Sequence, residues 1–303
     1  MKKLYGFAGA VLLLGMAALY GCGGSGGSDT GRLTLKLSDA PVDGATHVWI
    51  KFDAIEIKPA EGERLIYDLA ETQRIDLLTL TNGETATLLD GIELPAGQYN
   101  WIRLMVNTAP EDLSGGPFSE ENFCYIVIGE DAFPLVIPSG DQSGLKLNRP
   151  FVVPAGGSAN FVLDFDLRKS VHTAESGDKY ILRPTIRIED LSKVGTIAGE
   201  ITNLGVNTCA DAAVYVFGGS GIVPDDVDFI DPEPIASAKA VETEGVCGYT
   251  VPFLSEGPYT VALTFDAALD DPATDDASVV FDLAADASVV EDSVTTVNLA
   301  LPL

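Results

Sequence analysis

The chain has 303 residues, with 45 acidic side chains against 18 Lys and Arg, and its formal net charge at pH 7 is −27. Phosphate binding needs clustered Lys and Arg, so this balance excludes nucleic acid as a partner. It also argues against electrostatic docking on anionic lipid. The length suits two domains rather than one.

The first 22 residues carry the pattern of a secretory signal. Lys2 and Lys3 precede an apolar run over 4–19, and Cys22 stands directly before a Gly/Ser stretch over 23–28. This arrangement resembles the lipobox of bacterial lipoproteins, in which the signal is cut before the Cys and the Cys is acylated. The alternative is a plain signal peptide with a chance cysteine.

The lipobox resemblance implies a signal peptide over 1–21 and a lipidated tether over 22–30. The acylated Cys22 would attach the chain to a lipid bilayer, since several buried acyl chains anchor stably. Gly23, rather than Asp, follows the Cys, which resembles outer-membrane sorting in lipoproteins of Gram-negative bacteria. We therefore expect a lipid-anchored protein of the bacterial cell envelope, at the outer membrane.

Short apolar runs of period two then predict strands. Leu33, Leu35 and Leu37 alternate with polar residues, and the apolar parity changes between 48–52 and 55–57. Such a change flips the buried face, so we expect a bulge near residues 53–54. Further strands are expected at residues 102–106, 125–128, 135–137 and 151–153.

Residues 160–189 read as an antiparallel hairpin. Its apolar residues would share one face, while Asp164 and Asp166 would meet Arg183 and Arg187 on a solvent-exposed face. His172 would lie in the loop of this hairpin. It and His47 are the only histidines, and we expect both to be solvated surface residues.

The composition changes near residue 195. From there on, one basic residue stands against nineteen acidic ones, and seven short strands are expected with no helices between them. Evenly spaced short strands indicate a β-sandwich. The predicted fold is therefore all-β, with two β-sandwich domains in tandem, over 31–192 and 195–303, after the signal peptide and flexible linker.

Two family resemblances accompany these patterns. Residues 31–191 resemble the domain-of-unknown-function 4382 family of bacterial lipoproteins, which implies an envelope location and a β-rich fold and brings no catalytic residues. The segments that carry this resemblance are 35–41 (LKLSDAP), 48–56 (VWIKFDAIE), 75–80 (IDLLTL), 94–99 (LPAGQY) and 102–104 (IRL).

Residues 195–303 resemble the carboxypeptidase regulatory-like sandwich with transthyretin-like topology. Modules of that kind stabilise, space or bind rather than catalyse. The segments that carry this second resemblance are 195–201 (GTIAGEI), 213–217 (AVYVF), 248–251 (GYTV) and 257–261 (GPYTV).

Three cysteines remain in the body of the chain. Cys209 and Cys247 lie 38 positions apart and flank strand-like segments, so we expect a disulfide between them, worth roughly 2–4 kcal/mol. Cys124 would then be a lone, buried thiol. The spacing lacks the close CxxC pairs of a metal-binding cysteine site.

Two acidic loops are candidates for calcium. Ca²⁺ takes six to eight oxygen ligands, which carboxylates and carbonyls in such loops can supply. Neither loop has EF-hand spacing, and plain solvation of a turn is the favoured alternative, because Asp is common in turns. The candidate ligands are Asp225, Asp226, Asp228, Asp231, Asp270, Asp271, Asp275 and Asp276.

The two tryptophans are candidates for ligand binding. Alternate residues of a strand share a face, so Trp49 is expected on the same face as Lys51, opposite its apolar neighbours. In the same way, Trp101 is expected on one face with Tyr99 and Arg103. Large aromatic side chains on a polar face can stack on a sugar or bind a partner. The alternative, which we favour, is that a loop or the second domain covers this face and makes both residues core.

These observations predict a membrane-anchored extracytoplasmic lipoprotein that is not an enzyme and has a binding or structural role. Its expected partners are the bilayer and an envelope protein or polysaccharide. One alternative is a calcium-dependent adhesion or glycan-binding module. Another is an accessory hydrolase that uses scattered carboxylates, although no carboxylate pair stands out in the sequence.

Overall fold

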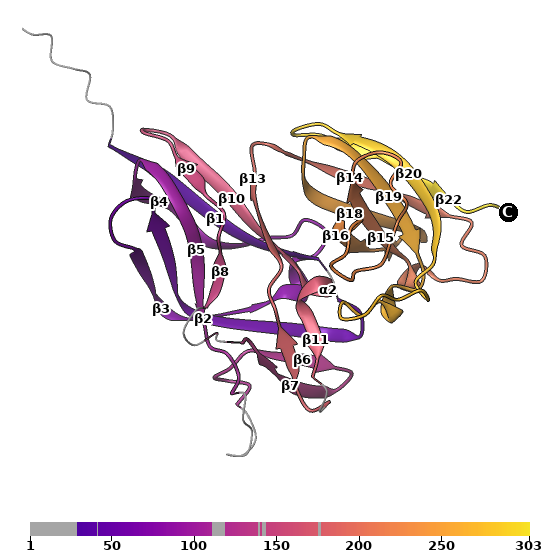
Figure 1. The fold of residues 1–303 in the computed structure, drawn as a ribbon, viewed down its shortest axis with the longest axis horizontal. Coiled ribbons are helices and arrows are strands. Elements are labelled where there is room, and N and C mark those ends of the chain that lie inside the picture. Colours follow the sequence, from indigo (N-terminus) through magenta and orange to yellow (C-terminus); the bar gives the residue numbers. More distant parts are fainter. Residues whose placement is uncertain (1–28, 41, 111–118, 139, 141–143, 175–176) are drawn as a thin grey trace, which may run out of the picture.

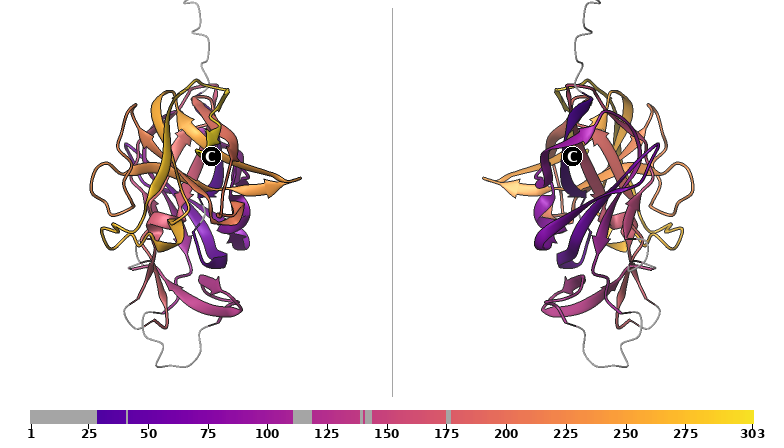
Figure 2. Two further views of the ribbon diagram at one scale, coloured as in Figure 1. Left: turned by 90° about the vertical axis from the view of Figure 1, so that its right-hand side faces the viewer. Right: turned by 90° about the vertical axis from the view of Figure 1, so that its left-hand side faces the viewer.

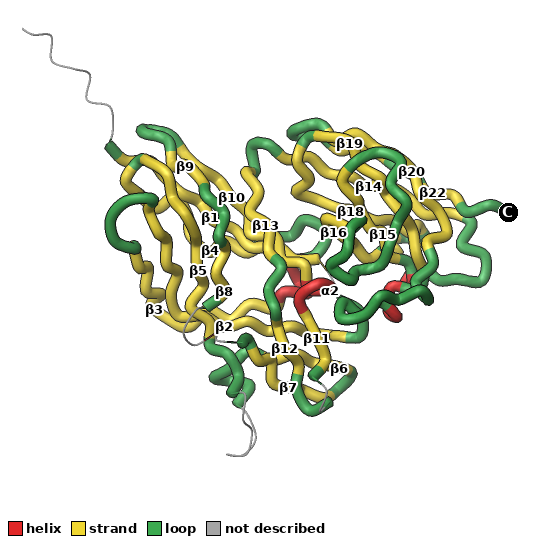
Figure 3. The backbone as a smooth tube through the Cα atoms, in the orientation of Figure 1, coloured by secondary structure: helices red, strands yellow, loops and turns green. Residues whose placement is uncertain are grey.

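The computed structural model describes residues 29–303, except 41, 111–118, 139, 141–143 and 175–176 (Figure 1). Strands dominate it, and they form two β-rich bodies side by side (Figure 3). The first sandwich comprises residues 30–190 and the second comprises residues 194–300. The predicted all-β class is confirmed. The predicted segments 1–21 and 23–28 and the predicted lipidation site Cys22 lie outside the described residues.

The first sandwich has a four-stranded sheet in the order β13-β10-β1-β4. Its alternating leucines form β1, which pairs parallel to β10 and antiparallel to β4. The strands are β1 (Thr30–Ala40), β4 (Ala86–Pro95), β10 (Ser158–Asp166) and β13 (Ile186–Asp190).

Its second sheet has nine strands in the order β11-β12-β7-β6-β2-β5-β8, with β3 on β2 and β9 on β5. The 3-10 helix η1 (Leu77–Leu80) follows β3. The strands are β2 (Ala45–Pro59), β3 (Leu65–Asp76), β5 (Gly97–Val106), β6 (Tyr125–Ile128), β7 (Asp131–Val136), β8 (Leu145–Leu147), β9 (Phe151–Val153), β11 (Val171–Thr173) and β12 (Tyr180–Leu182).

The predicted bulge lies in β2. The register with both β3 and β5 shifts between Phe52 and Ala54. The apolar residues before and after the shift, Ile50 and Ile55 among them, therefore all face one core. A second shift, opposite Lys58 and Pro59, turns Tyr99 inward against Phe151 at 5.2 Å between ring centroids. The prediction that Tyr99 shares the polar face with Trp101 was wrong for this reason.

The second sandwich pairs a sheet in the order β17-β18-β14-β21, with β22 also on β14, and a sheet in the order β16-β15-β19-β20. The two short helices η2 (Cys209–Asp211) and η3 (Ala267–Leu269) lie in its connections. The strands are β14 (Val194–Thr202), β15 (Ala213–Gly218), β16 (Pro234–Lys239), β17 (Val241–Thr243), β18 (Val246–Ser255), β19 (Gly257–Thr264), β20 (Phe281–Val289), β21 (Val294–Thr296) and β22 (Leu299–Ala300).

One short helix, α2 (Leu167–Ser170), lies where the two sandwiches meet (Figures 1 and 2). The Asp166 carboxylate accepts a hydrogen bond from Lys169 N and caps the helix. All four helix residues are buried, including Arg168 and Lys169. Charged side chains are rarely buried without partners. Lys169 pairs with Glu233 and Arg168 donates to the Ala267 carbonyl, both in the second sandwich.

The segment over 160–189 is more complex than a hairpin. β10 and β13 pair antiparallel and set Asp164 opposite Arg187 as expected, and the two side chains form an ion pair. The intervening residues, however, form α2, β11 and β12. Asp164 and Asp166 are buried rather than solvated. The second sandwich lies against β1 and β13 of this sheet, so the predicted solvent-exposed face was wrong.

Candidate metal centre

A small apolar cluster on the outer face of the β16-β15-β19-β20 sheet positions the two acidic loops. Tyr215 of β15 packs there with Val227 and Ala267. Val227 directly follows Asp226, and Ala267 lies three residues before Asp270. Burial of these two apolar side chains therefore draws both loops over the same part of the sheet.

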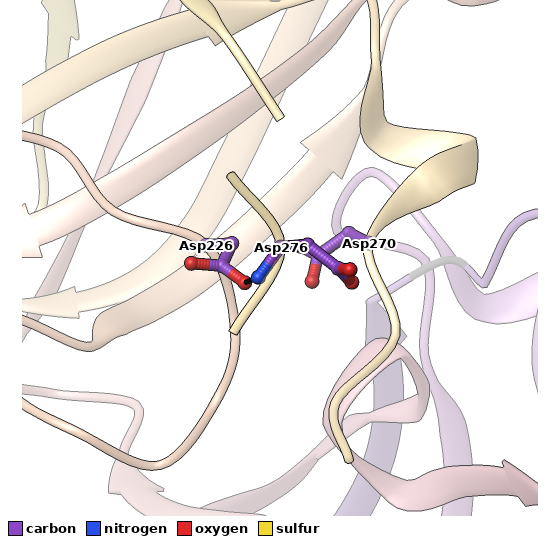
Figure 4. Close-up of side chains that lie close together, drawn as sticks. All are labelled: Asp226, Asp270 and Asp276. Carbon is purple, nitrogen blue, oxygen red and sulfur yellow. Dashed lines mark hydrogen bonds between the residues drawn. The ribbon is translucent and has the colours of Figure 1, made fainter. Parts of the chain in front are cut away.

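Three carboxylates converge at this point (Figure 4). One oxygen from each of Asp226, Asp270 and Asp276 lies within 4.8 Å of the other two. Asp226 is only 3% exposed, and the other two are half-buried. The cluster combines Asp226 of the 219–233 loop with Asp270 and Asp276 of the 270–280 loop, so its ligands come from both predicted calcium loops.

Backbone amides hold these carboxylates in place. Asp276 N donates to Asp226 Oδ2 at 2.6 Å, and Asp271 N donates to Asp276 Oδ2 at 2.7 Å. Val227 N donates to Asp270 Oδ1 at 3.2 Å. A carboxylate offers about four lone-pair sites, so each side chain retains acceptor capacity after these bonds. The loops are thus ordered around oxygens that can still bind a cation.

Asp270 is the most perturbed member of the cluster. Burial raises the pKa of Asp270 to about 6, against the opposing effects of the Tyr215 hydrogen bond and the Arg168 charge. The nearby Asp226 carboxylate adds to the rise by like-charge repulsion. A cation at the cluster would favour the ionised form and reverse this shift.

A chain of contacts links the cluster to the first sandwich. The Tyr215 hydroxyl donates to Asp270 Oδ2, and the guanidinium of Arg168 lies 5.2 Å from the Tyr215 ring centroid. Arg168 Nη1 donates to the Ala267 carbonyl at 2.7 Å, and its Nη2 pairs with Asp43 Oδ2 at 2.6 Å. One buried cation of the first sandwich therefore contacts the loop that carries Asp270.

The cluster suits calcium in its ligand chemistry. Ca²⁺ prefers oxygen ligands at about 2.3–2.6 Å, so two ligands of one ion lie at most about 5 Å apart. The three carboxylate oxygens meet that limit. Asp226, Asp270 and Asp276 would hold the ion, and waters or carbonyls would complete its six to eight oxygens.

The other five predicted ligands do not join the cluster. Asp228 and Asp271 accept hydrogen bonds from Ile230 N and Ala273 N, the bonding expected of Asp in a turn. Asp225, Asp231 and Asp275 are exposed. For these five residues, the structure favours the solvation alternative.

Residues 30–184, about half of the chain, match the protein family described as "Domain of unknown function (DUF4382)". The chain belongs to this family. The matched region, the DUF4382 region, ends just before β13 and so contains nearly all of the first sandwich. It includes α2, whereas Asp226, Asp270 and Asp276 lie outside it. No curated protein matches the chain.

Several solved structures are weakly similar to the chain. They include a leucine-rich repeat protein from Bacteroides thetaiotaomicron (13% identity, TM-score 0.20), the Bacillus anthracis TIE protein (13%, 0.21) and the minor pilin GBS52 of Streptococcus agalactiae (10%, 0.21). The matches cover 91%, 90% and 88% of this chain, and 26%, 33% and 94% of the respective relatives. Scores this low support no inference about fold or function.

Trp49 of the DUF4382 region lies in an aromatic stack on the outer face of β2. Its ring stacks with His47 at 5.9 Å and with Tyr125 at 6.2 Å, and the Arg74 guanidinium lies 4.0 Å from its centroid. The His47 ring in turn bonds Asp76 at 2.6 Å and is half exposed. Trp49 is half-buried and is not part of the apolar core.

Trp101 lies elsewhere on the same sheet, opposite Lys58 and so nine residues along β2 from Trp49. The Arg103 guanidinium lies 5.3 Å from the centroid of its ring, and Lys146 Nζ lies 4.7 Å from it. Arg103 Nε donates to Glu56 at 2.7 Å, so this predicted ligand-binding cation already has a buried partner. The structure does not bring the two tryptophans into one site.

The cysteines of the body follow the prediction. Cys209 and Cys247 form a disulfide with their Cα atoms 5.5 Å apart. Cys124 is a free, buried thiol of the DUF4382 region, and burial raises its pKa to about 11. At neutral pH it is therefore a protonated, unreactive side chain. No helix in the described residues is long and apolar enough to cross a membrane.

Sequence reasoning missed two buried polar groups. His172 lies on β11 and is 8% exposed, so the prediction that it is a solvated loop residue was wrong. Burial, and then the charge of Arg183, lower the pKa of His172. Arg168 was not singled out, because a basic residue after a strand has no distinctive sequence signal.

Proposed function

We propose that this chain is a lipoprotein of the bacterial cell envelope, anchored through acylated Cys22, with a non-catalytic binding or structural role. We propose further that its second sandwich binds Ca²⁺ through Asp226, Asp270 and Asp276. The observation that carries the calcium proposal is the convergence of three carboxylates from two separate loops.

The contacts of the cluster favour a structural ion over acid–base chemistry. Backbone amides and the Tyr215 hydroxyl fix the carboxylates, so they serve better as ligands than as movable proton carriers. A cation would neutralise charge that the chain holds at close range in a partly buried site. It would thereby order the loops that contact Arg168 of the first sandwich.

A thermal melt tests the calcium site. The mature chain with Cys22→Ser would be unfolded in calcium, in chelator and in magnesium at matched ionic strength. A ligand at a hundred times its Kd stabilises by about 2.7 kcal/mol, and each kcal/mol moves Tm by roughly 2–4 °C at this size. We expect calcium, and not magnesium, to raise Tm by roughly 5–10 °C.

A matched pair of variants sharpens this test. Asp276→Asn replaces one carboxylate of the cluster with a neutral amide, a weaker ligand for Ca²⁺, and should abolish the calcium-specific rise. Asp275→Asn removes the same charge one residue away, from an exposed side chain outside the cluster, and should retain it. Coincident wild-type curves in calcium and chelator, or equal loss in both variants, would contradict the proposal.

The anchor is tested by labelling. We propose that cleavage before Cys22 and acylation place the chain at the outer membrane, in keeping with Gly23 after the Cys. Cells that express the chain should incorporate labelled palmitate into it and retain it in the membrane fraction, because several acyl chains hold it there. Cys22→Ala should lose both the label and the retention. Label incorporation at an unchanged level in Cys22→Ala would refute acylation at this residue.

The second sandwich supports the non-catalytic role through its resemblance to carboxypeptidase regulatory-like modules. Such a module would space or stabilise the DUF4382 region at the envelope. Its two packed sheets and its disulfide suit an oxidising compartment outside the cytoplasm.

A further inference from the structure

A second polar constellation lies in a cleft between the two sandwiches, apart from the carboxylate cluster. The cleft has a volume of about 730 Å³, which is within the usual range for small-molecule sites. Lys146, His172 and Arg183 of the first sandwich and Asp228, Phe229 and Pro272 of the second line it. Clefts at domain interfaces are common positions for ligand sites.

The cationic side of the cleft consists of Arg183 and Lys146, whose Nζ also lies 4.7 Å from the Trp101 ring centroid. Lys146 and Arg183 are exposed, and neither has an ion-pair partner among the described residues. At least eight of the other fourteen Lys and Arg side chains in the described residues have one, among them Arg64, Arg103 and Arg187. In a chain with a net charge of −27, two cations without an ion-pair partner in one cleft favour an anionic group there.

His172 is the independent second observation. It lines the cleft and is more than nine-tenths buried, yet neither ring nitrogen has a hydrogen-bond partner among the described residues. A buried polar group without a partner is costly, so native proteins seldom leave one unsatisfied. A polar group of a ligand in the cleft would supply the missing hydrogen bond.

Phe229 forms the facing wall. Its side chain is 55% exposed, and its backbone has φ 65°, a conformation that bulky residues rarely adopt. Strain of this kind clusters at ligand sites, because the fold must hold the residue there. With Pro184 and Pro272 it offers flat apolar surface, and the Asp228 carboxylate beside it can accept hydrogen bonds from hydroxyl groups.

We propose that this cleft binds a sugar acid. The carboxylate would pair with Arg183 and Lys146 and meet His172, the ring face would pack on Phe229, and hydroxyl groups would donate to Asp228. A neutral sugar would leave both cations unpaired, and an inorganic anion would use neither the apolar wall nor Asp228. The proposal goes beyond the proposed function, and it concerns a site that contains none of the three calcium ligands.

The imidazole signals of His172 provide the readout. The chain has only two histidines, so a spectrum of His47→Gln assigns the remaining signals to His172. The mature chain with Cys22→Ser would be titrated at fixed pH with D-glucuronate, with glucose and with inorganic phosphate. We expect a saturable shift of the His172 signals with glucuronate, none with glucose, and at least tenfold weaker binding of phosphate.

Charge-matched variants complete the test. Arg183→Gln and Lys146→Gln should each weaken glucuronate binding at least tenfold. Arg32→Gln loses the same charge from an exposed position at the start of β1 and should bind as the wild type does. Equal response to glucose, equal or tighter binding of phosphate, no response to glucuronate, or equal weakening in all three variants would each overturn the proposal.

Discussion

Asp270 couples the protonation state of the protein to its stability. Burial raises its pKa to about 6 in the fold, from the ordinary value of 3.8. At pH values between 3.8 and about 6, Asp270 of the folded state holds its proton more tightly than Asp270 of the unfolded chain does. By linkage, stability therefore falls as pH rises from about 4 to about 6, and it levels off above that range.

This coupling is measurable without metal. In chelator, the free energy of unfolding of the wild type minus that of Asp270→Asn should fall across pH 4 to 6, by at most about 3 kcal/mol at 1.36 kcal/mol per pKa unit. Taking the difference between the two proteins cancels the titrating groups that do not interact with Asp270. Urea titrations at several pH values provide the measurement. A difference that stays flat or rises with pH would show that Asp270 is not buried as described.

The candidate site was only partly predictable at the level of residues. Eight Asp side chains in two loops stand out in the sequence, and three of them meet. Burial of Val227 and Ala267 on the outer face of the sheet determines which three carboxylates meet. That burial depends on tertiary packing. Exposed Asp275 and half-buried Asp276 are indistinguishable in sequence, since both follow the same turn.

At the level of elements, α2 is the part of the fold that connects the two sandwiches. Arg168 is 3% exposed and pairs with Asp43, whose carboxylate also accepts from Lys239 Nζ at 3.0 Å. Burial raises the pKa of Asp43, but Arg168 and then Lys239 outweigh it, so the net pKa is lowered. The carboxylate is thus ionised in the fold and depends on its cations.

Arg168 and Lys239 should contribute unequally to the stability of the fold. Arg168→Ala leaves the Asp43 carboxylate partly buried without its main partner, a change that costs about 3–5 kcal/mol at buried pairs. Lys239→Ala removes a side chain that is 40% exposed, and exposed pairs contribute about 0–1 kcal/mol. Chemical denaturation of both variants measures these costs. Equal destabilisation by the two substitutions would place the pair in solvent rather than in a buried junction.

Strand prediction succeeded where apolar and polar residues alternate and failed where that alternation is weak or continues past the end of the strand. The clean alternation of β1 located it, and the parity change in β2 located its bulge. β3 was missed because most of its side chains are exposed and polar, so it carries little period-two signal. α2 was missed because Leu167 continues the apolar parity of β10, and only the Asp166 cap and the neighbouring sandwich make it helical.

The whole molecule consists of two apolar cores joined by a polar junction. One core takes its side chains from the DUF4382 region and β13, and the other takes them from the disulfide-bonded second sandwich. Across the junction, Lys169 Nζ pairs with Glu233 at 2.6 Å, and Ser255 Oγ donates to Glu189 at 3.2 Å. Unfolding of one sandwich alone would break these contacts, so they link the unfolding of the two sandwiches.

The junction should therefore make the two sandwiches unfold together. Calorimetry of the wild type should give one transition, and the double variant Arg168→Ala/Lys169→Ala should give two, since each core keeps its own packing after the ion pairs are lost. Two further substitutions, Cys209→Ser and Cys247→Ser, show which of the two transitions belongs to which sandwich. Loss of a disulfide costs roughly 2–4 kcal/mol, and it should lower only the transition of the second sandwich. One transition that merely shifts to lower temperature in the double variant would show that apolar contacts, and not α2, couple the two sandwiches.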